Sequence, residues 1–298
     1  MRSGFVALAG RPNAGKSTLI NQLVGEKVAI VSSKPQTTRS EIRGIYTDDE
    51  CQIVFTDTPG IHKAKLRLET RMNKEAADVI QDVDVIYLVV DGSQKYGPGD
   101  AFVLDMVKNT HLPVFLILNK VDKMDRDKVV EVLQSWQEKY EFAEYFPVSA
   151  LFGKSFKDLI QTTARYMPEG DLMYPPEIIS DGAENFRIAE IIREKILRCT
   201  EQEIPHSSAV LVENKKFKKN ACYIQAVILV EKDSQKGIMI GKQGSMLKKI
   251  GTLARADIEK LLDKKVFLEL FVRVESEWRS KDARITEYGY GGAGRDDE

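Results

Sequence analysis

The first half of the chain alternates continuous apolar runs with segments of helical periodicity. The apolar runs predict buried strands at residues 5–9, 51–56, 84–91, 113–118 and 145–148. The intervening segments predict helices over residues 18–23, 97–109, 126–140 and 155–166. Residues 41–46 and 51–56 bracket a polar turn and predict a hairpin. This alternation predicts an α/β fold with a mostly parallel sheet covered by helices on both faces.

The pattern changes after a segment rich in Pro and Gly, and we predict domains at 1–168 and 184–298 joined by a linker at 169–183. In the second domain we predict the order helix, strand, strand, helix, helix, strand, with a glycine loop at 237–245 between the two middle helical segments. The predicted ranges are a helix at 184–199, strands at 208–213 and 221–231, a helix at 245–262 after the loop, and a last strand at 266–274. A lysine-rich turn at 215–220 separates the first two strands. From residue 275 the chain is polar, and we predict a flexible tail with a glycine-rich end at 289–295.

Composition narrows the functional classes. The 298 residues carry a net charge of −1, with 43% hydrophobic and 30% charged residues, which is ordinary for a soluble protein and excludes a general polycation. The three cysteines lie far apart, which argues against zinc and disulfides and favours the cytoplasm. No apolar run approaches 18 residues, so we expect no membrane span.

The candidate chemistry starts with Gly10-Arg11-Pro12-Asn13-Ala14-Gly15-Lys16-Ser17. The pattern Gly, four residues, Gly-Lys-Ser between a strand and a helix predicts a phosphate-binding loop. Backbone N–H groups and the helix N-terminus would hold the phosphates, Lys16 would bridge the outer phosphates, and Ser17 would hold Mg²⁺. The predicted nucleotide contacts of this segment are Gly10, Asn13, Ala14, Gly15, Lys16, Ser17 and Thr18.

Two loops are predicted to complete the phosphate site. The polar segment 31–39 offers Thr37 and Thr38, and we favour Thr38 as a Mg²⁺ ligand while Thr37 stays open. Asp57 ends a buried strand, where its carboxylate suits the outer shell of Mg²⁺, and the N–H of Gly60 would approach the γ-phosphate. Ile61 has no group that orients water, and His62 is a lone loop histidine, more often only solvated.

A second motif predicts base recognition. Asn119-Lys120-Val121-Asp122 follows a buried strand. The Asp122 carboxylate can accept hydrogen bonds from guanine N1–H and its amine, which adenine cannot supply, so the site would reject adenine strongly. A backbone N–H in Ser149-Ala150-Leu151 would meet guanine O6.

The second domain carries a candidate RNA site. Gly241 and Gly244 frame a Gly-x-x-Gly loop between two helical segments, the layout of a KH RNA-binding domain. Residues 215–255 contain ten basic and two acidic residues, a net of +8 that points to a polyanion. The bases would lie beside Ile238, Ile240 and Leu247. The predicted RNA contacts are Ile240, Gly241, Lys242, Gln243, Gly244, Lys248 and Lys249.

These motifs together resemble the Era GTPases over essentially the whole chain. The resemblance rests on GRPNAGKS, PQTTR, DTPGI, NKVD and SAL in the first half and GIMIGKQGSMLKKIG in the second. It implies a P-loop GTPase domain followed by a type II KH domain. It also implies Mg²⁺-dependent GTP hydrolysis to GDP, binding near the 3′ end of 16S ribosomal RNA and a role in assembly of the small (30S) ribosomal subunit.

The resemblance further suggests a potassium ion near Asn13, in the role of an arginine finger. We assign catalysis to Lys16, Thr38, Gly60 and Asn13. We expect a cytoplasmic monomer, and peripheral association with the inner membrane face stays open.

Two other functions compete with this reading. An RNA-modifying or metabolic enzyme would need further catalytic groups, and the second half shows no nucleophile–base pair or metal cluster. A membrane-associated switch would share the first half, but no lipidation motif supports it.

Overall fold

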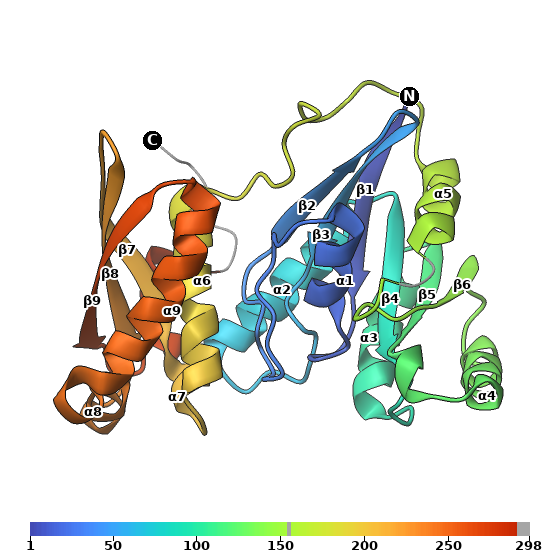
Figure 1. Cartoon of the computed structure of the whole chain (residues 1–298). Coiled ribbons are helices and arrows are strands. Elements are labelled where there is room, and N and C mark those ends of the chain that lie inside the picture. The colour runs from blue at the N-terminus through green and yellow to red at the C-terminus, as the bar shows by residue number, and fades with distance from the viewer. Residues whose placement is uncertain (154–155, 291–298) are drawn as a thin grey trace. The chain divides into compact units, whose positions relative to one another are not determined.

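A computed structural model describes residues 1–153 and 156–290 (Figure 1). The chain divides into two compact units, one of residues 1–65 and 69–181, the other of residues 66–68 and 182–298. Each unit has its own sheet and its own core. No helix in the described residues is long and apolar enough to cross a membrane.

The first unit is built on a six-stranded sheet in the order β2-β3-β1-β4-β5-β6. The strands are β1 (Arg2–Ala9), β2 (Ile42–Thr47), β3 (Cys51–Asp57), β4 (Val85–Asp91), β5 (Val114–Asn119) and β6 (Glu144–Pro147). All neighbours pair in parallel except β2 and β3, which form the predicted hairpin. The carboxyl ends of β1, β3, β4 and β5 therefore lie along one edge of the sheet.

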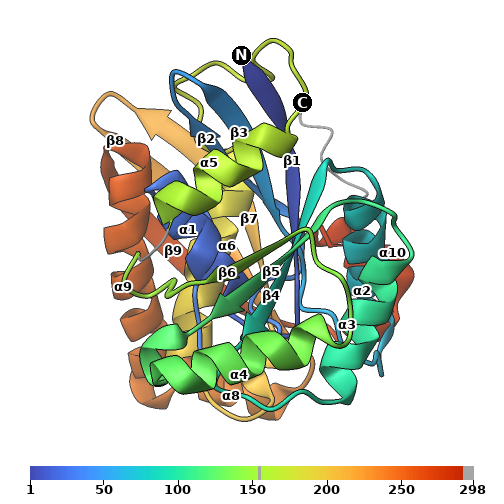
Figure 2. The same ribbon diagram turned by 90° about the vertical axis from the view of Figure 1, so that its right-hand side faces the viewer.

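Helices cover both faces of this sheet (Figure 2). They are α1 (Lys16–Val24), α2 (Arg67–Gln81), α3 (Pro98–Lys108), α4 (Arg126–Gln137) and α5 (Phe156–Tyr166), with a 3₁₀ turn η1 (Val121–Lys123) after β5. Apolar residues of α2, α3 and α4 share one core with the sheet. On the other face, Tyr166 of α5 packs edge-on against Phe115, with ring centroids 4.9 Å apart. The predicted α/β architecture is confirmed.

Helix α2 was absent from the sequence-based prediction. Its sequence is mostly polar, and the buried apolar positions are Leu68, Met72, Ala76 and Ile80, each four residues from the next. Ala76 and Ile80 belong to the core that α2 shares with the sheet. A stripe this narrow is enough to hold a helix against a sheet because the i, i+4 positions share one face.

The predicted linker forms no helix or strand, but residues 169–181 are bound to the first unit. The fully buried carboxamide of Gln52 accepts hydrogen bonds from the backbone N–H groups of Met173 (2.8 Å) and Tyr174 (2.9 Å). It also donates to the carbonyl of Tyr174 at 2.9 Å. Further along, the N–H of Ile45 donates to the carbonyl of Ile179. Only residues 182 and 183 of the predicted linker fall outside this unit.

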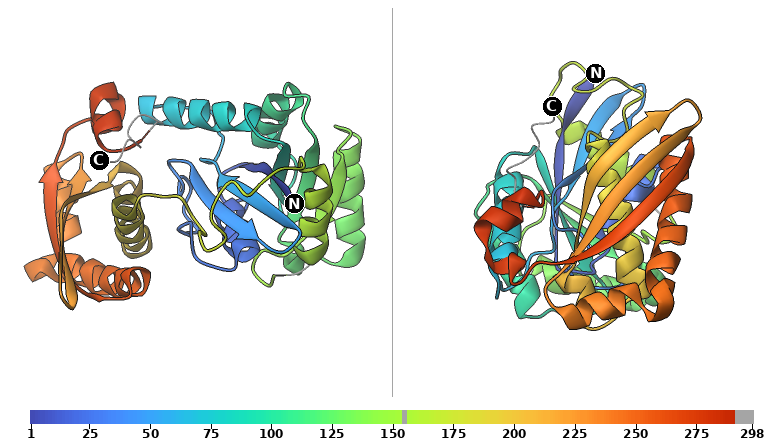
Figure 3. Two further views of the ribbon diagram at one scale, coloured as in Figure 1. Left: turned by 90° about the horizontal axis from the view of Figure 1, so that it is seen from above. Right: turned by 90° about the vertical axis from the view of Figure 1, so that its left-hand side faces the viewer.

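The second unit has a three-stranded sheet in the order β7-β8-β9. Its elements are α6 (Glu184–Cys199), α7 (Ile204–Ser207), β7 (Ala209–Lys218), β8 (Ala221–Val230), α8 (Asp233–Ile240), η2 (Lys242–Gly244), α9 (Ser245–Leu262), β9 (Lys265–Val274), η3 (Trp278–Ser280) and α10 (Asp282–Glu287). β7 and β8 are antiparallel, and β8 and β9 are parallel. Helices α6 and α9 pack on one face, and the right panel of Figure 3 shows the strands from the other face. The predicted order of elements is confirmed.

The prediction of a lysine-rich turn at residues 215–220 is wrong in its extent. Residues 215–218 continue β7 and pair with β8, and only Lys219 and Asn220 form the turn. The two strands are ten residues long and form nine residue pairs, with a bulge between Val212 and Asn214. β7 is an edge strand, where exposed lysines are tolerated and discourage pairing with another chain. The charges that suggested a turn therefore belong to a strand.

The prediction of a flexible tail is also wrong through residue 290, because the chain beyond β9 is packed. Trp278 is fully buried, and its indole N–H donates to the carbonyl of Ser207 at 2.8 Å. Tyr288 and Tyr290 pack against the Trp278 ring, with centroids 5.6 and 5.8 Å from it. Burial of these aromatic rings fixes the segment through residue 290. Residues 291–295 of the predicted flexible end lie outside the described residues.

Candidate nucleotide and RNA sites

The phosphate loop connects β1 to α1, and its two glycines are required by space. A Cβ on Gly10 would lie 2.4 Å from the carbonyl oxygen of Val89. A Cβ on Gly15 would lie 2.2 Å from Nδ2 of Asn119, and Gly15 has a φ of +100°. Only residues without a side chain allow the loop to come this close to β4 and β5.

Lys16 stands at the first position of α1 and is buried. Its ammonium donates to the carbonyl of Gly10 at 3.2 Å, so the side chain folds back over the loop. Burial lowers the pKa of Lys16, and the nearby Asp57 opposes this shift. The structure thus holds an ammonium group beside the predicted phosphate site, as the motif predicts.

Three oxygen-bearing side chains converge beside the loop. The Ser17 hydroxyl donates to Oδ2 of Asp57 at 2.5 Å, and the Thr38 hydroxyl donates to the same atom at 2.9 Å. The two hydroxyls lie 3.0 Å apart. The Thr37 hydroxyl instead donates to the carbonyl of Lys34 at 2.7 Å. Of the two threonines left open by the sequence, Thr38 is the one that lies with Ser17 and Asp57.

Asp57 is fully buried, and its Oδ1 has no hydrogen-bond partner in the described residues. Burial raises the pKa of this carboxyl, while Lys16, Ser17 and Thr38 oppose the rise. A buried carboxylate oxygen without a partner is costly unless a cation or water meets it. Hydroxyl and carboxylate oxygens are the donors that Mg²⁺ prefers, so these residues fit a magnesium ion.

Gly60 lies against the phosphate loop. A Cβ there would be 2.9 Å from Cα of Pro12, and the next N–H, that of Ile61, donates to the carbonyl of Gly10 at 3.2 Å. The side chain of Ile61 is fully buried in the core under the sheet. The Ile61 side chain therefore lacks a polar group and also faces away from solvent.

His62 differs from the expectation of a solvated loop residue. Its Nδ1 lies 2.9 Å from the carbonyl of Gly60, and its Nε2 lies 3.2 Å from Nε2 of Gln36. Gln36 in turn donates to Glu69 at 2.7 Å. The sequence analysis did not predict that the loops at 31–39 and 57–65 would share this network, because Gln36 lies 26 residues before His62 in the chain.

The base-recognition motif is organised by Asn119, which is 2% exposed. Its Nδ2 donates to the carbonyl of Ala14 at 2.9 Å, and its Oδ1 accepts from the N–H of Ala150 at 2.9 Å. The ammonium of Lys120 donates to the carbonyl of Asn13 at 2.7 Å and to Asp91 at 2.6 Å. The role of Asp91, at the end of β4, was not predicted.

Asp122 is exposed and accepts a hydrogen bond from the Ser149 hydroxyl at 2.5 Å on Oδ1. This bond leaves the carboxylate open to solvent on its other side. The N–H of Ala150 is engaged by Asn119, and the side chain of Leu151 is 66% exposed. The loop after β5 thus contacts the phosphate loop, and the loop after β6 contacts the loop after β5, so the predicted guanine contacts lie together.

The Gly-x-x-Gly loop lies between α8 and α9. Gly241 and Gly244 have φ values of +74° and +76°, and a Cβ on Gly241 would lie 2.8 Å from the N atom of Met246. Gln243 also has a positive φ, of 52°. The side chains of Lys242, Gln243, Lys248 and Lys249 are exposed. The loop therefore presents its backbone and basic side chains to solvent at the N-terminus of α9.

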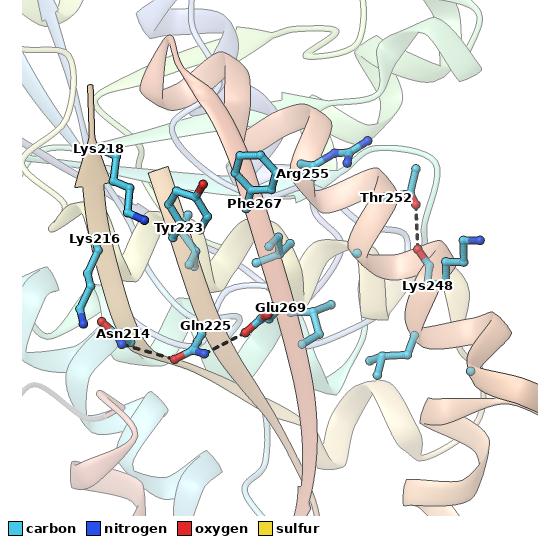
Figure 4. Close-up of a pocket in the computed structure, with 16 residues that line it drawn as sticks. Asn214, Lys216, Lys218, Tyr223, Gln225, Lys248, Thr252, Arg255, Phe267 and Glu269 are labelled. Carbon is cyan, nitrogen blue, oxygen red and sulfur yellow. Dashed lines mark hydrogen bonds between the residues drawn. The ribbon is translucent and has the colours of Figure 1, made fainter. Parts of the chain in front are cut away.

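A cavity of about 860 Å³ runs beside this loop (Figure 4). Its walls include Gly244, Leu247, Lys248 and Arg255 on the α9 side. Of the three apolar residues predicted to border the bases, Leu247 lines the cavity, whereas Ile238 and Ile240 do not. Ile238 is 53% exposed outside the cavity, so the predicted contacts of Ile238 and Ile240 with bases in this cavity are not supported.

Comparisons with known proteins agree with the predicted identity of both units. Residues 5–120 match the 50S ribosome-binding GTPase family, and residues 203–279 match the KH domain family. A GTPase Era of Clostridium kluyveri is 48% identical over 97% of this chain and 99% of its own length.

Two solved structures are similar over 97% of this chain and 99% of their own, each with 36% identity. One is a variant of Aquifex aeolicus Era bound to GDP and AlF₄⁻, with a TM-score of 0.94. The other is Era in complex with MgGDPNP and nucleotides 1506–1542 of 16S ribosomal RNA, with a TM-score of 0.95. On this full-length identity, and on the phosphate and Gly-x-x-Gly loops described above, the chain belongs to the Era family of GTPases.

Proposed function

We propose that this protein is a GTP-driven switch that binds the 3′ end of small-subunit ribosomal RNA and acts in assembly of that subunit. The observation that carries the proposal is the presence, in one chain, of a complete phosphate loop and a basic Gly-x-x-Gly cleft. A relative of the same length has been solved with MgGDPNP and a fragment of 16S ribosomal RNA, which supports assigning both ligands to this chain.

At the phosphates, Ser17 and Thr38 would hold Mg²⁺ directly, and Asp57 would bind one of its waters through the unpartnered Oδ1. Bound Mg²⁺ neutralises charge on the β- and γ-phosphates. Lys16 leaves the carbonyl of Gly10 and donates to the outer phosphates, and the N–H of Gly60 donates to the γ-phosphate. These groups place positive charge where negative charge develops.

Because Ile61 is apolar and buried, hydrolysis relies on charge near the phosphates more than on a side chain that orients water. We assign part of that charge to K⁺ at Asn13. Nδ2 of Asn13 donates to the carbonyl of Ser33 at 2.9 Å, and its Oδ1 accepts no hydrogen bond from the described residues. An exposed oxygen in the phosphate loop is a suitable ligand for a monovalent cation.

The guanine base would contact the carboxylate of Asp122 through N1–H and the exocyclic amine. Ser149 holds that carboxylate in place, and Asn119 joins the base loop to the phosphate loop. Backbone N–H groups of the loop 149–151 would face O6.

The switch would act through the loops at 31–39 and 57–65. Thr38 lies in the first loop and Gly60 in the second, so a γ-phosphate with Mg²⁺ would order both, and hydrolysis would release them. The link from His62 through Gln36 to Glu69 lets the two loops respond together. RNA affinity would then differ between the GTP and GDP states.

In the second unit, the RNA backbone would pass against Gly241 and Gly244, with phosphates near Lys242, Lys248 and Lys249. Bases would lie in the cavity beside Leu247. The ribosomal target assigns the protein to the cytoplasm, and we propose that it acts as a monomer. Peripheral membrane association is the competing location.

Cross-linking in cells, followed by sequencing of the bound RNA, tests this function. We expect reads concentrated at the 3′ end of the small-subunit ribosomal RNA, and co-sedimentation with small subunits instead of membranes. A variant with Lys242→Asp and Gln243→Asp provides the matched control and should lose the enrichment. Reads spread evenly over cellular RNA, or enrichment unchanged in the variant, would contradict the proposal.

A further inference from the structure

We propose that the helix-free face of the β7-β8-β9 sheet is a second RNA-binding surface. A strand leaving the Gly-x-x-Gly cleft would turn around β9, stack one base on Phe267 and place phosphates beside Lys216 and Lys218. This inference rests on the proposed RNA function and extends it to a surface opposite α6 and α9. We call the residues Lys216, Lys218, Tyr223 and Phe267 the outer face.

The sheet register places these four side chains together. Lys216 is paired with Tyr223, and Tyr223 is paired with Phe267, so all three point to the same side of the sheet. Lys218 lies two residues further along β7 on that side. The neighbouring positions Cys222, Ile224 and Val266 point the other way, into the core beneath α6 and α9. Figure 4 shows the outer-face side chains projecting from the strands.

The aromatic pair forms a column with one open end. The rings of Tyr223 and Phe267 are stacked, with centroids 4.7 Å apart and an interplanar angle of 11°. The ammonium of Lys218 lies 4.6 Å from the centroid of Tyr223, on the β7 side. β9 is the edge strand, and Phe267 is 54% exposed. In the described residues Phe267 makes no ring contact other than that with Tyr223, so the exposed part of its ring is open to a planar partner.

Charge around the column favours a polyanion. Lys216 and Lys218 of β7 stand on this face, and Lys248 and Arg255 of α9 line the same cavity. Glu269 is the nearest acidic residue of β9, and its carboxylate is held in a hydrogen-bonded row with Gln225 and Asn214. The Glu269 carboxylate in that row repels phosphates, so the backbone of a bound strand would stay on the lysine side of the aromatic pair.

The outer face is continuous with the proposed RNA cleft. The same cavity of about 860 Å³ is lined by Lys248 and Arg255 of α9 and by Lys216, Tyr223 and Phe267 of the sheet. Figure 4 shows α9 on one side of β9 and the outer-face residues on the other. A KH cleft clamps about four nucleotides, so a longer bound strand must leave it, and the path around β9 leads to an aromatic platform.

Single-stranded RNA fits this surface better than an acidic protein segment. Bases stack on exposed aromatic rings whatever their sequence, and lysines follow the phosphates, which is how single-strand binders are built. An acidic segment would use the lysines but would leave the open face of Phe267 without a planar partner. The binding experiments below distinguish the two.

Affinity measurements on the whole protein test the stacking. The probe is a fluorescein-labelled RNA of nucleotides 1506–1542 of 16S ribosomal RNA, together with a series shortened to about four nucleotides. Phe267→Ala should weaken the long RNA by about 10-fold and leave the shortest RNA that still binds unaffected. Phe267→Trp should restore binding of the long RNA, because a larger ring stacks at least as well.

Phe271→Ala is the matched control. Phe271 is on the same strand and the same face and is 52% exposed, but it does not line the cavity. It should bind both RNAs as the wild type does. Because Phe267 and Phe271 are both half-exposed, neither change should alter the melting temperature appreciably, which circular dichroism will verify.

Salt dependence tests the phosphate contacts. Lys216→Gln with Lys218→Gln should flatten the dependence of log Kd on log salt for the long RNA by up to about two units, with no change for the short one. Ultraviolet cross-linking of the long RNA carrying 5-iodouridine should recover a peptide that contains Phe267 or Tyr223.

The outcomes separate the two proposals. If the wild type binds neither RNA, the proposed function fails. If the wild type binds the long RNA and Phe267→Ala binds it equally well, the function stands and the outer face is not an RNA surface. Equal weakening of long and short RNAs would show that Phe267 only supports the cleft. Binding of polyglutamate that is lost in the double lysine variant, with RNA binding unchanged, would show an acidic protein partner instead.

Discussion

The side chain of Asn119 donates a hydrogen bond to the carbonyl of Ala14 across 2.9 Å, and this bond ties the base-recognition loop to the phosphate loop. The same carboxamide accepts from the N–H of Ala150. One buried residue at the end of β5 therefore holds three loops in register before any ligand binds.

Replacing this brace should destabilise the protein itself. Asn119→Ala leaves a buried carbonyl and a buried N–H without partners, and we expect a loss of about 1–3 kcal/mol in the free energy of unfolding of the nucleotide-free protein. Urea denaturation measures it. Asn109→Ala, an exposed asparagine whose amide also bonds a carbonyl, should change stability by about 0.5 kcal/mol or less. Equal losses of unfolding free energy in the two variants would show that Asn119 does not brace the loops.

Base specificity depends on the carboxylate of Asp122. Asp122→Asn presents an amide donor where guanine has N–H donors, so GTP binding should fall while xanthosine triphosphate, which has an oxygen in place of the amine, should bind better. Competition binding with labelled GDP measures both. Unchanged GTP affinity in the variant would contradict the assignment of guanine recognition to Asp122.

Magnesium binding should respond to acid through Asp57. Burial raises the pKa of this carboxyl above its ordinary 3.8, so the group takes up a proton earlier than an exposed aspartate as the pH falls. Protons and Mg²⁺ then compete, and the gain in GDPNP affinity that Mg²⁺ provides should shrink on acidification from neutral pH. Titration calorimetry measures the gain at each pH. Asp57→Asn, which cannot titrate at this position, should show a smaller gain whose pH dependence is only that of the nucleotide's own phosphates.

The same raised pKa affects stability without ligand. The folded state binds the Asp57 proton more tightly than the unfolded state does, so its contribution to stability is present at low pH and is lost as the pH rises through the folded-state pKa. Relative to Asp57→Asn, the nucleotide-free wild type should therefore become more stable on acidification. A gap between the two that is constant with pH would contradict the shift.

Potassium should accelerate hydrolysis through Asn13. GTP turnover should be faster in KCl than in NaCl at equal ionic strength, because the proposal places K⁺ beside the exposed Oδ1 of Asn13. Asn13→Ala should remove the difference between the salts. It also removes the hydrogen bond to Ser33, so GDPNP affinity of the variant serves as the control for a damaged loop. Identical rates in both salts for the wild type would remove the proposal.

The Gly-x-x-Gly loop should be needed for RNA and dispensable for GTP. Lys242→Asp with Gln243→Asp places two negative charges where phosphates must pass, and both side chains are exposed, so folding should be intact. We expect normal GTP hydrolysis and at least a tenfold loss of single-stranded RNA affinity, with a flatter salt dependence of the residual binding. Wild-type RNA affinity in a folded variant would place the RNA site elsewhere.

Several features could be predicted from local sequence because their cause is local. Gly10, Gly15 and Lys16 have fixed spacing between an apolar run and a helix, and that spacing alone is enough to shape a phosphate loop. The Gly-x-x-Gly loop was found for the same reason, since Gly241 and Gly244 adopt the positive φ that their identity permits. Buried parallel strands were found because they are continuously apolar.

What the prediction missed depends on partners distant in sequence. The lysines at 215–218 were predicted as a turn because their pairing with β8 cannot be read from local sequence. The segment after residue 275 was predicted to be flexible because the hydrogen bond from Trp278 to the carbonyl of Ser207 joins residues that are far apart in the chain. The sequence favoured Thr38 over Thr37, but the contacts of Thr38 with Asp57 and Ser17 depend on the fold.

Local sequence was enough to identify the residues expected to bind phosphate, guanine and RNA, because backbone freedom and side-chain chemistry are properties of the residues themselves. Which of these residues meet depends on the folded arrangement of the chain. That arrangement brought Asn119 to Ala14, joined His62 to Gln36, and stacked Tyr223 on Phe267, since such contacts depend on strand order and register. Those relations are set by the packing of the whole sheet, and no short stretch of sequence encodes them.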